Sequence, residues 1–276
     1  MPELPEVETV RRVLLSIIPR SPILDIRILT PKILQNVTPD EFCTRLTGEV
    51  LEDIQRRGKY LILLYTHEVL VSHLRMEGRY QFEENLEPTK HDHILFVWQE
   101  GILAYHDTRK FGTMHLFRRE EDIWKMNPLQ KLGPEPMDEI MSVSYLKKCF
   151  QKRKRAIKST LLDQTIMSGL GNIYVDEILF RARIHPLRPA SSLNDEEITQ
   201  IISHSSSVLQ EAIACGGTTI RTFAIGTIHG RFQHELQIHG KNECPICHTT
   251  IKKIVVGGRG TYHCKNCQCI DKSPSL

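Results

Sequence analysis

The chain has 276 residues, of which 40% are apolar and 25% are charged, a composition typical of a globular protein. This composition argues against intrinsic disorder, and no apolar run approaches the roughly 20 residues of a membrane-spanning helix. The first eight residues contain two prolines and three glutamates, which are not typical of a secretory signal peptide. We therefore expect a cytoplasmic protein with no membrane partner.

The net charge of +3 is unevenly distributed along the chain. Residues 1–140 hold 18 Lys/Arg against 23 Asp/Glu, a net charge of −5, whereas residues 141–276 hold 18 against 10, a net charge of +8. A basic second half suits a polyanionic partner such as a nucleic acid, although a solvated basic surface would give the same count. Charge alone leaves both interpretations open.

The first half predicts one helix followed by antiparallel strands. In residues 6–18, apolar side chains recur every three or four positions until Pro19, the pattern of an amphipathic helix. Strand-like runs then occur in pairs around short polar turns, which predicts two hairpins and an antiparallel sandwich. These runs are residues 60–65, 69–74, 93–98 and 102–106.

A proline- and glycine-rich stretch at residues 132–136 separates this half from a helical one. The expected helices are residues 143–151, 156–162, 173–183 and 195–214. From residue 232 onward the pattern predicts short strands around paired cysteines. The fold class is therefore α+β, with predicted domains at residues 1–135, 136–231 and 232–276.

Four cysteines near the end of the chain have the spacing of a zinc site. Cys244 and Cys247 form one CxxC pair, Cys264 and Cys267 form a second, and 16 residues separate the pairs. Two such pairs can present four thiolates tetrahedrally to one structural zinc ion, with no open position for a substrate. Cys269 offers a competing thiolate, but two intervening residues favour Cys267. His248 and His263, which adjoin the ligands, are expected to be surface side chains.

A basic segment and a glycine-rich turn in the second half predict phosphate binding. Seven of the twelve residues from 147 to 158 are Lys or Arg, a density that suits a DNA backbone, although a solvated helix face is the alternative. The turn at residues 168–172 opens onto a predicted helix, whose free N–H groups can bind phosphate oxygens.

Three motifs together resemble the formamidopyrimidine-DNA glycosylase family. They are the N-terminal string PELPEVET at residues 2–9, the sequence GNIY at residues 171–174, and the four-cysteine hairpin. Smaller motifs at Lys59 and at residues 73–76, 90–93 and 107–112 extend the resemblance over nearly the whole chain. It implies a β-sandwich carrying the first helix, a helix-two-turns-helix domain with a zinc hairpin, and damaged duplex DNA held between them.

The resemblance assigns the chemistry of a bifunctional glycosylase and strand-cleaving lyase to four residues. Pro2, freed by removal of Met1, is the nucleophile, and Glu3 is the acid that protonates the sugar ring oxygen. An α-amine at neutral pH is about 300-fold richer in free base than a lysine. Lys59 is a phosphate contact and proton donor for β-elimination, and Arg259 assists δ-elimination. Glu6 and Glu8 are expected only to favour the helix start or to position neighbours.

The resemblance also assigns DNA contacts. Met76, Arg109 and Phe111 fill and probe the gap left by an extruded nucleotide, and His91, Arg153 and Asn172 contact DNA elsewhere. Residues 216–223 resemble a lesion-recognition loop, with Thr218, Thr219, Ile220, Arg221 and Thr222 at its centre. The segment at 224–231 and the tail at 269–276 are less familiar, so lesion preference stays open.

Two rival functions share these features. One is the related class that removes oxidised pyrimidines, against which Leu4 and the set Met76, Arg109 and Phe111 argue. The other is a catalytically silent DNA-binding protein, against which the intact Pro2, Glu3 and Lys59 argue. We expect a monomer that uses no small-molecule cofactor, whereas the preferred opposite base cannot be predicted.

Overall fold

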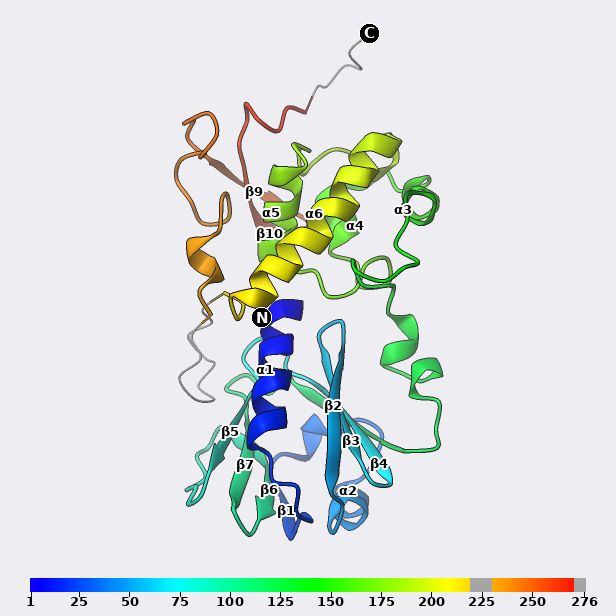
Figure 1. Cartoon of the computed structure of the whole chain (residues 1–276), viewed down its shortest axis with the longest axis vertical. Helices are drawn as coiled ribbons and strands as arrows, with labels where there is room; N and C mark the ends of the chain where they lie inside the picture. Colours follow the sequence, from blue (N-terminus) through cyan, green and yellow to red (C-terminus); the bar gives the residue numbers. More distant parts are fainter. Residues whose placement is uncertain (219–229, 271–276) are drawn as a thin grey trace. The chain divides into compact units, whose positions relative to one another are not determined.

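The computed structural model describes residues 1–218 and 230–270. The chain divides into two compact units (Figure 1). The first comprises residues 1–130 with 216–230, and the second comprises residues 131–215 with 231–276. Of the helices in the described ranges, none combines the length and the apolar character needed to cross a lipid bilayer.

The first unit begins with helix α1 (Leu4–Ile17). Glu3 is the N-cap residue, and it forms a capping box with Glu6 that satisfies backbone N–H groups at the helix start. Val7, Val10 and Leu14 are buried on one face of the helix. The helix ends before Pro19, as predicted, because the residue preceding a proline is pushed out of the α region. Accordingly, Ile18 is extended, with ψ at 128°.

Two four-stranded antiparallel sheets form the body of the first unit (Figure 1). One has the strand order β1-β6-β7-β5 and the other the order β2-β3-β4-β8. Both predicted hairpins are present, as β3–β4 and β6–β7, so the predicted antiparallel sandwich is confirmed. The strands are β1 (Asp25–Ile28), β2 (Leu51–Arg57), β3 (Tyr60–Tyr65), β4 (Glu68–His73), β5 (Arg79–Glu83), β6 (Asp92–Trp98), β7 (Gly101–His106) and β8 (Thr113–Arg118).

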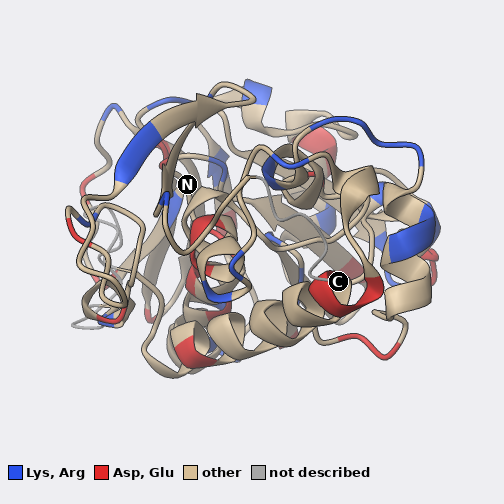
Figure 2. Ribbon diagram, turned by 90° about the horizontal axis from the view of Figure 1, so that it is seen from above, with Lys and Arg blue, Asp and Glu red and all other residues tan. Residues whose placement is uncertain are grey.

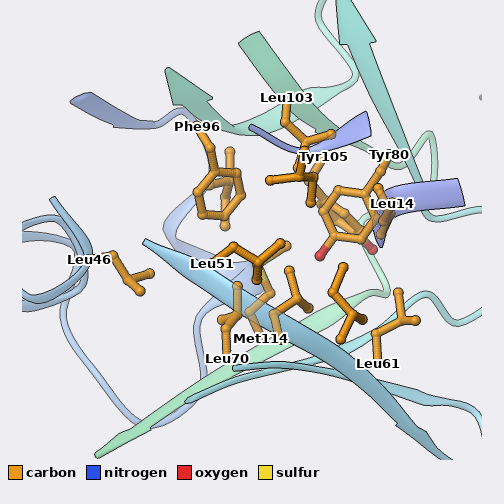
Figure 3. Close-up of a cluster of buried hydrophobic side chains, with 14 of the residues drawn as sticks. Leu14, Leu46, Leu51, Leu61, Leu70, Tyr80, Phe96, Leu103, Tyr105 and Met114 are labelled. Carbon is orange, nitrogen blue, oxygen red and sulfur yellow. The ribbon is translucent and has the colours of Figure 1, made fainter. Parts of the chain in front are cut away.

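The apolar core of this unit lies between the two sheets. Leu51, Leu70 and Met114 of one sheet belong to the same buried cluster as Phe96 and Tyr105 of the other (Figure 3). The inner face of α1 joins this cluster, as does helix α2 (Pro39–Leu46). This continuous burial makes the sandwich a rigid support for the segments at its edges.

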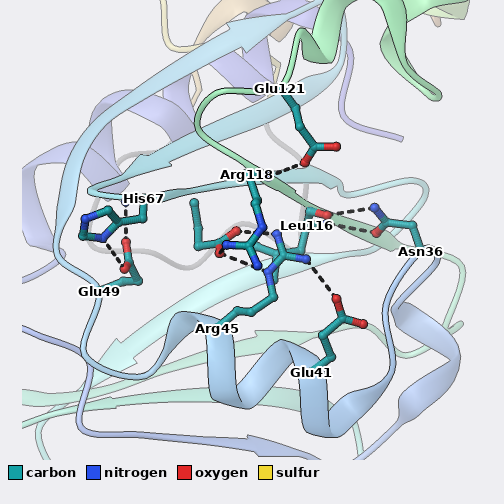
Figure 4. A network of polar contacts seen from close by, with 9 residues as sticks. Asn36, Glu41, Arg45, Glu49, His67, Leu116, Arg118 and Glu121 are labelled. Atoms are coloured by element: carbon teal, nitrogen blue, oxygen red, sulfur yellow. Dashed lines mark hydrogen bonds and ion pairs between the residues drawn. The ribbon is translucent and has the colours of Figure 1, made fainter.

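A polar network ties α2 to the second sheet (Figure 4). Arg45 of α2 donates to both carboxylate oxygens of Glu68 at the start of β4, at 3.0 and 2.5 Å, and also to Glu41. Glu68 is only 3% exposed, so its charge is compensated by a two-point contact rather than by water. We assign this network a structural role.

The second unit contains four helices in its described part: α3 (Val143–Phe150), α4 (Ile157–Leu161), α5 (Asn172–Arg181) and α6 (Asp195–Ala214). The predicted helix at 195–214 is confirmed to the residue, because Asn194 accepts from the backbone N–H of Glu197 and the Glu197 side chain accepts from the backbone N–H of Asn194. The other three predicted helices are present and slightly shorter.

A two-stranded hairpin, β9 (Lys252–Val256) and β10 (Arg259–His263), completes the second unit. Gly257 and Gly258 form its turn with φ of +56° and +75°, a conformation that favours glycine at both positions. The prediction of strands from residue 232 onward is wrong for its first part, because Phe232–His234 forms a short 3-10 helix. The remaining 3-10 helices are Pro31–Ile33, Ile123–Lys125, Leu129–Lys131 and Ala190–Ser192.

Candidate functional site

The N-terminus of α1 is closely packed within the first unit. Pro2 is buried and Glu3 is 3% exposed. The backbone N–H of Glu3 donates to Oε2 of Glu6 at 2.9 Å, while Oε1 of Glu6 accepts from the backbone N–H and the hydroxyl of Thr218 at 2.8 and 3.0 Å. Glu6 therefore positions the residue beside Pro2 against the segment that begins the predicted lesion loop.

Lys59 lies in the turn between β2 and β3 and is 5% exposed. The turn passes through Gly58 at a φ of +56°. Arg56 braces it, donating from Nη1 to the Gly58 carbonyl at 3.1 Å and from Nε to Glu8 of α1 at 3.3 Å. Burial raises the pKa of Glu8, but hydrogen bonds from Arg11 and Arg12 outweigh this effect and hold the pKa below its ordinary value. Glu8 is thus a positioning group between α1 and the Lys59 turn.

Three predicted DNA-probing residues lie on two loops of the first unit. Met76 follows β4 and is partly exposed, whereas Arg109 and Phe111 follow β7 and are exposed. The Arg109 guanidinium carbon lies 4.7 Å from the centre of the Phe111 ring, a cation–π contact between two solvent-facing side chains. His91, before β6, is partly exposed with its ring 5.5 Å from that of His106.

His73 supports the loop that carries Met76. Its Nδ1 accepts from the backbone N–H of Arg75 at 2.9 Å, and Arg75 has a φ of +54°. Burial, with the nearby charges of Arg75 and Lys59, lowers the pKa of His73 to about 3. A neutral imidazole therefore accepts this hydrogen bond throughout the physiological pH range.

The four predicted zinc ligands come together in the second unit. The Sγ atoms of Cys244, Cys247, Cys264 and Cys267 all lie within 4.8 Å of one another. Those of Cys247 and Cys264 are 3.3 Å apart, and those of Cys244 and Cys267 are 3.8 Å apart. Tetrahedral zinc with bonds of about 2.3 Å requires separations of about 3.8 Å, so the site fits one ion. Cys269 is exposed and lies outside this cluster.

The buried Lys158 and the partly buried Asn172 hold the base of the hairpin turn. The exposed Arg259 begins β10, and the carbonyl of the next residue, Gly260, accepts from Nζ of Lys158 at 3.1 Å and from Nδ2 of Asn172 at 2.9 Å. Lys158 also pairs with Asp176 of α5 at 2.7 Å, and both side chains of this pair are fully buried. The predicted DNA contact Asn172 is therefore also a structural contact with the hairpin.

The basic segment at 147–158 is not uniformly directed to solvent. Figure 2 colours the Lys and Arg positions of the described chain blue. The interpretation of Lys158 as part of a solvent-facing phosphate clamp is wrong, because its ammonium group is buried against Asp176. Lys152 and Lys154 are exposed, and Arg153 is partly exposed, donating to the Cys149 carbonyl.

The prediction that His263 is a surface side chain is also wrong. His263 is 6% exposed, with its ring 4.6 Å from that of His185, because β10 turns this side chain into the unit. His248, by contrast, is exposed as predicted. The predicted loop residues Thr219, Ile220, Arg221 and Thr222 lie outside the described residues, as do residues 224–229 and the tail from 271 onward.

Three family models match successive parts of this chain. The formamidopyrimidine-DNA glycosylase N-terminal domain matches residues 1–114, the H2TH domain of the same glycosylase matches residues 132–224, and the zinc finger found in FPG and IleRS matches residues 241–268. The chain belongs to the formamidopyrimidine-DNA glycosylase family. It is therefore a DNA glycosylase with a four-cysteine zinc finger, and the predicted fold class and metal are confirmed.

Relatives match over almost the full length. Formamidopyrimidine-DNA glycosylases of Bacillus cereus and Bacillus subtilis are 50% and 47% identical, each covering 97% of this chain and 99% of the relative. A Lactococcus lactis FPG mutant solved with a Fapy-dG containing DNA has a TM-score of 0.92 at 40% identity, covering 97% of this chain and all of the other. The Lactococcus lactis Fpg solved with an abasic site containing DNA has a TM-score of 0.91 at 39% identity, covering 97% and 99%.

Sequence reasoning missed several buried acidic groups that shape the site. Asp107 accepts three backbone N–H groups of the loop that carries Arg109. Glu177 accepts from the N–H groups of residues 237, 238 and 239 at 2.8 to 3.0 Å, which anchors the segment before the zinc hairpin. The sequence does contain a signal for this role, since Asp176 and Glu177 are adjacent within an otherwise apolar helix. Carboxylates buried in such a helix require compensating hydrogen-bond or charge partners, which predicts that they anchor another segment.

Proposed function

We propose that the chain is a bifunctional glycosylase and lyase that removes oxidised purines, 8-oxoguanine and formamidopyrimidines, from duplex DNA in base excision repair. The observation that carries this proposal is the N-terminus of α1, where a buried Glu3 directly follows Pro2 in the unit that also buries Lys59. The similarity to an enzyme solved with a Fapy-dG containing DNA supports this substrate class. We expect the active form to be cytoplasmic and monomeric.

In the proposed reaction the amine of Pro2 attacks C1′ of the damaged nucleotide. The bond from C1′ to the base breaks, and the base leaves with the bonding electrons and gains a proton. Glu3 gives its proton to the ring oxygen as the bond from C1′ to that oxygen opens, leaving an iminium between Pro2 and C1′. Loss of a C2′ proton then expels the 3′ phosphate, and a second elimination expels the 5′ phosphate.

Removal of Met1 is a precondition for this reaction. While Met1 is attached, the nitrogen of Pro2 is a tertiary amide with no available lone pair, so it cannot form an imine. Met1 is 40% exposed, which leaves it accessible to trimming. Lys59 and Arg259 then serve as the phosphate contacts that assist the β- and δ-eliminations.

Access to the base requires rotation of the nucleotide out of the duplex. We assign Met76 to the vacated stack, Arg109 to the orphaned opposite base and Phe111 to the wedge between base pairs, since these side chains lie on two supported loops and face solvent. His91 and Arg153 are assigned as DNA contacts, and Asn172 as a contact with the DNA backbone. Thr218 to Thr222 are assigned to lesion recognition, and Glu6 holds the first of them.

A borohydride trapping experiment tests the proposal. Protein whose intact mass shows loss of Met1 is incubated with duplex DNA containing 8-oxoguanine opposite cytosine, and the covalent adduct is mapped by peptide mass. We expect an adduct at Pro2. An adduct at a lysine, Lys59 first, would show that Pro2 is not the nucleophile, and no adduct would favour the catalytically silent alternative.

Matched variants and substrates sharpen this test. Glu3→Gln should bind DNA and barely turn over, whereas Pro2→Gly replaces the secondary amine of proline with a primary amine and should keep some activity. Protein that retains Met1 should bind and fail to trap. A duplex with an oxidised pyrimidine serves as the comparison substrate, and faster excision of that base would assign the chain to the pyrimidine-specific alternative.

A further inference from the structure

Two loops of the first unit carry the side chains assigned to the DNA interior. We define probe loop 1 as residues 74–78, with Met76, and probe loop 2 as residues 107–112, with Arg109 and Phe111. They follow β4 and β7, which belong to different sheets of the sandwich. Without a connection between the loops, Met76 could move independently of Arg109 and Phe111.

The carboxylate of Asp107 holds probe loop 2. Asp107 is completely buried. Its Oδ1 accepts from the N–H of Arg109 at 3.0 Å, and its Oδ2 accepts from the N–H groups of Phe111 and Gly112 at 2.9 and 2.8 Å. The loop passes through Lys110 at a φ of +55°, which a non-glycine residue adopts only with such support.

The ring of Tyr105, two residues earlier on β7, joins the two loops. A Cβ atom placed on Gly78 of probe loop 1 or on Gly112 of probe loop 2 would overlap the Tyr105 hydroxyl, so this oxygen lies against the backbone of both. The structure gives the hydroxyl no hydrogen-bond partner among residues 1–218 and 230–270. Burial, followed by the charge of Asp107, raises the pKa of Tyr105, so the hydroxyl stays protonated.

Other contacts also cross between the loops. The hydroxyl of Thr108 in probe loop 2 donates to the carboxylate of Glu77 in probe loop 1. Probe loop 1 is closed by the bond from the Gly78 N–H to the Leu74 carbonyl at 2.9 Å and by the contact of His73 with the Arg75 N–H. Each loop therefore has a defined shape, and the two shapes meet at Tyr105.

We propose that Asp107 and Tyr105 are positioning residues that hold the two probe loops in one arrangement, so that Met76, Arg109 and Phe111 enter the duplex as a unit and discriminate the opposite base. This inference rests on the proposed function for the roles of those three side chains. Asp107 holds the backbone conformation of probe loop 2, and Tyr105 sets the distance between the backbones of the two loops.

The substitution Asp107→Asn is the sharpest test, because it keeps the size of the side chain and replaces one acceptor oxygen with an N–H₂ donor. In one orientation of the asparagine amide its N–H₂ group faces the N–H of Arg109, and in the other orientation it faces the N–H groups of Phe111 and Gly112. Both orientations place donor against donor. Tyr105→Phe removes only the oxygen between the glycines. Glu68→Gln is the matched control, since it neutralises another buried carboxylate at the far end of β4.

The primary readout is binding, measured without turnover. Each variant is titrated with a duplex carrying an uncleavable tetrahydrofuran abasic analogue, placed opposite cytosine or opposite adenine, and the ratio of the two Kd values is compared. We expect both Asp107→Asn and Arg109→Ala to change this ratio about tenfold, and Tyr105→Phe to change it about threefold. Glu68→Gln should lower Tm and leave the ratio unchanged.

A second readout separates positioning from chemistry. A single-stranded oligonucleotide with a natural abasic site has neither an opposite base nor a stack to fill, so trapping on it should not need the probe loops. We expect Asp107→Asn to trap on it at the wild-type level while losing trapping on duplex DNA.

An unchanged Kd ratio in Asp107→Asn, or an equal loss on single-stranded and duplex DNA, would overturn the inference. If the wild-type protein traps on neither substrate, the proposed chemistry fails, and the Kd ratio still decides the role of the loops.

Discussion

The sandwich and the zinc hairpin each hold functional side chains at the edge of a unit, but they do so with different forces. The sandwich relies on a large apolar core between two sheets (Figure 3). The core around the hairpin is a small cluster that includes Phe180, Ile238 and Ile251 together with the ligands Cys244 and Cys264. Val255 on β9 is 74% exposed, so the strands have little apolar cover. The hairpin therefore depends on metal coordination and on one buried ion pair.

This difference implies different failure modes. A sandwich with a continuous core tolerates the loss of one polar contact, since the remaining packing still determines the fold. A hairpin with few apolar contacts loses its order when its metal or its buried charge pair is removed.

Loss of zinc should have the largest effect, and it should be confined to the hairpin. Coordination of structural zinc contributes about 10–16 kcal/mol in small zinc domains. Cys264→Ser should therefore abolish metal binding and remove protection from hydrogen exchange across residues 241–268, while the sandwich keeps its protection. Cys269→Ser is the control and should retain one zinc per chain. Equal loss of protection in both units would contradict the independence of the two supports.

Lys158→Met should be the next largest change. Removing one partner of a fully buried ion pair leaves the Asp176 charge uncompensated, at a cost of about 3–5 kcal/mol. It also removes a donor from the Gly260 carbonyl, so hydrogen exchange should increase in β10 as well as in α5. If Lys158→Met destabilises the protein no more than a substitution at the exposed Lys154, the buried pair does not support the hairpin.

A pH titration should expose the sandwich's own dependence on a buried group, His73. Its pKa is about 3 in the folded protein and about 6.5 when unfolded, so the unfolded chain binds more protons between these values. The contribution of His73 is complete above pH 6.5 and is lost as the pH falls toward 3. Between pH 7 and pH 5 this loss is about 2 kcal/mol.

His73→Asn tests this assignment, because Oδ1 of asparagine can accept from the Arg75 N–H without titrating in this range. Denaturant unfolding at pH 7 and pH 5 should show a smaller change in the free energy of unfolding for the variant than for the wild type. The same slope in both proteins would assign the acid sensitivity to other groups.

The smallest expected effect on stability is that of Lys154→Met. Lys154 is exposed in the basic segment, so the free energy of unfolding should change by less than about 0.5 kcal/mol. A plot of log K for DNA binding against log salt concentration has a negative slope. The magnitude of this slope should fall by about 1, because one phosphate contact is lost. An unchanged slope would remove this residue from the DNA interface.

The sequence predicted the regular elements best where local signals agree. The helix at 195–214 has both a capping box and apolar periodicity, and both hairpins have short polar turns. Helix α2 and strands β1, β2, β5 and β8 were missed. In β1 the sequence DIRI has only four residues, and in β2 the sequence LEDIQRR is rich in charge. A register shift between Leu51 and Asp53 also disturbs the alternation in β2. Their place in the sheets is decided by tertiary packing.

The sequence motifs predicted the residues of the candidate site, but they did not predict the buried side chains that hold those residues in place. Cysteine spacing predicted the zinc cluster, because ligand geometry imposes the spacing. The burial of Lys158 could not be predicted, since its partners Asp176 and Gly260 lie 18 and 102 residues away. The role of Asp107 could not be predicted either, because its carboxylate accepts backbone N–H groups only when the loop after it has folded.

The contact of Glu6 with Thr218 joins positions 212 residues apart. During synthesis the chain emerges from the ribosome in order, so α1 and both sheets can form long before residue 218 is available. The nascent sandwich therefore lacks the partner that holds Glu6 until most of the second unit has also been translated. Completion of the N-terminal site is thus a late event in biogenesis, although the residues that form it are among the first to be made.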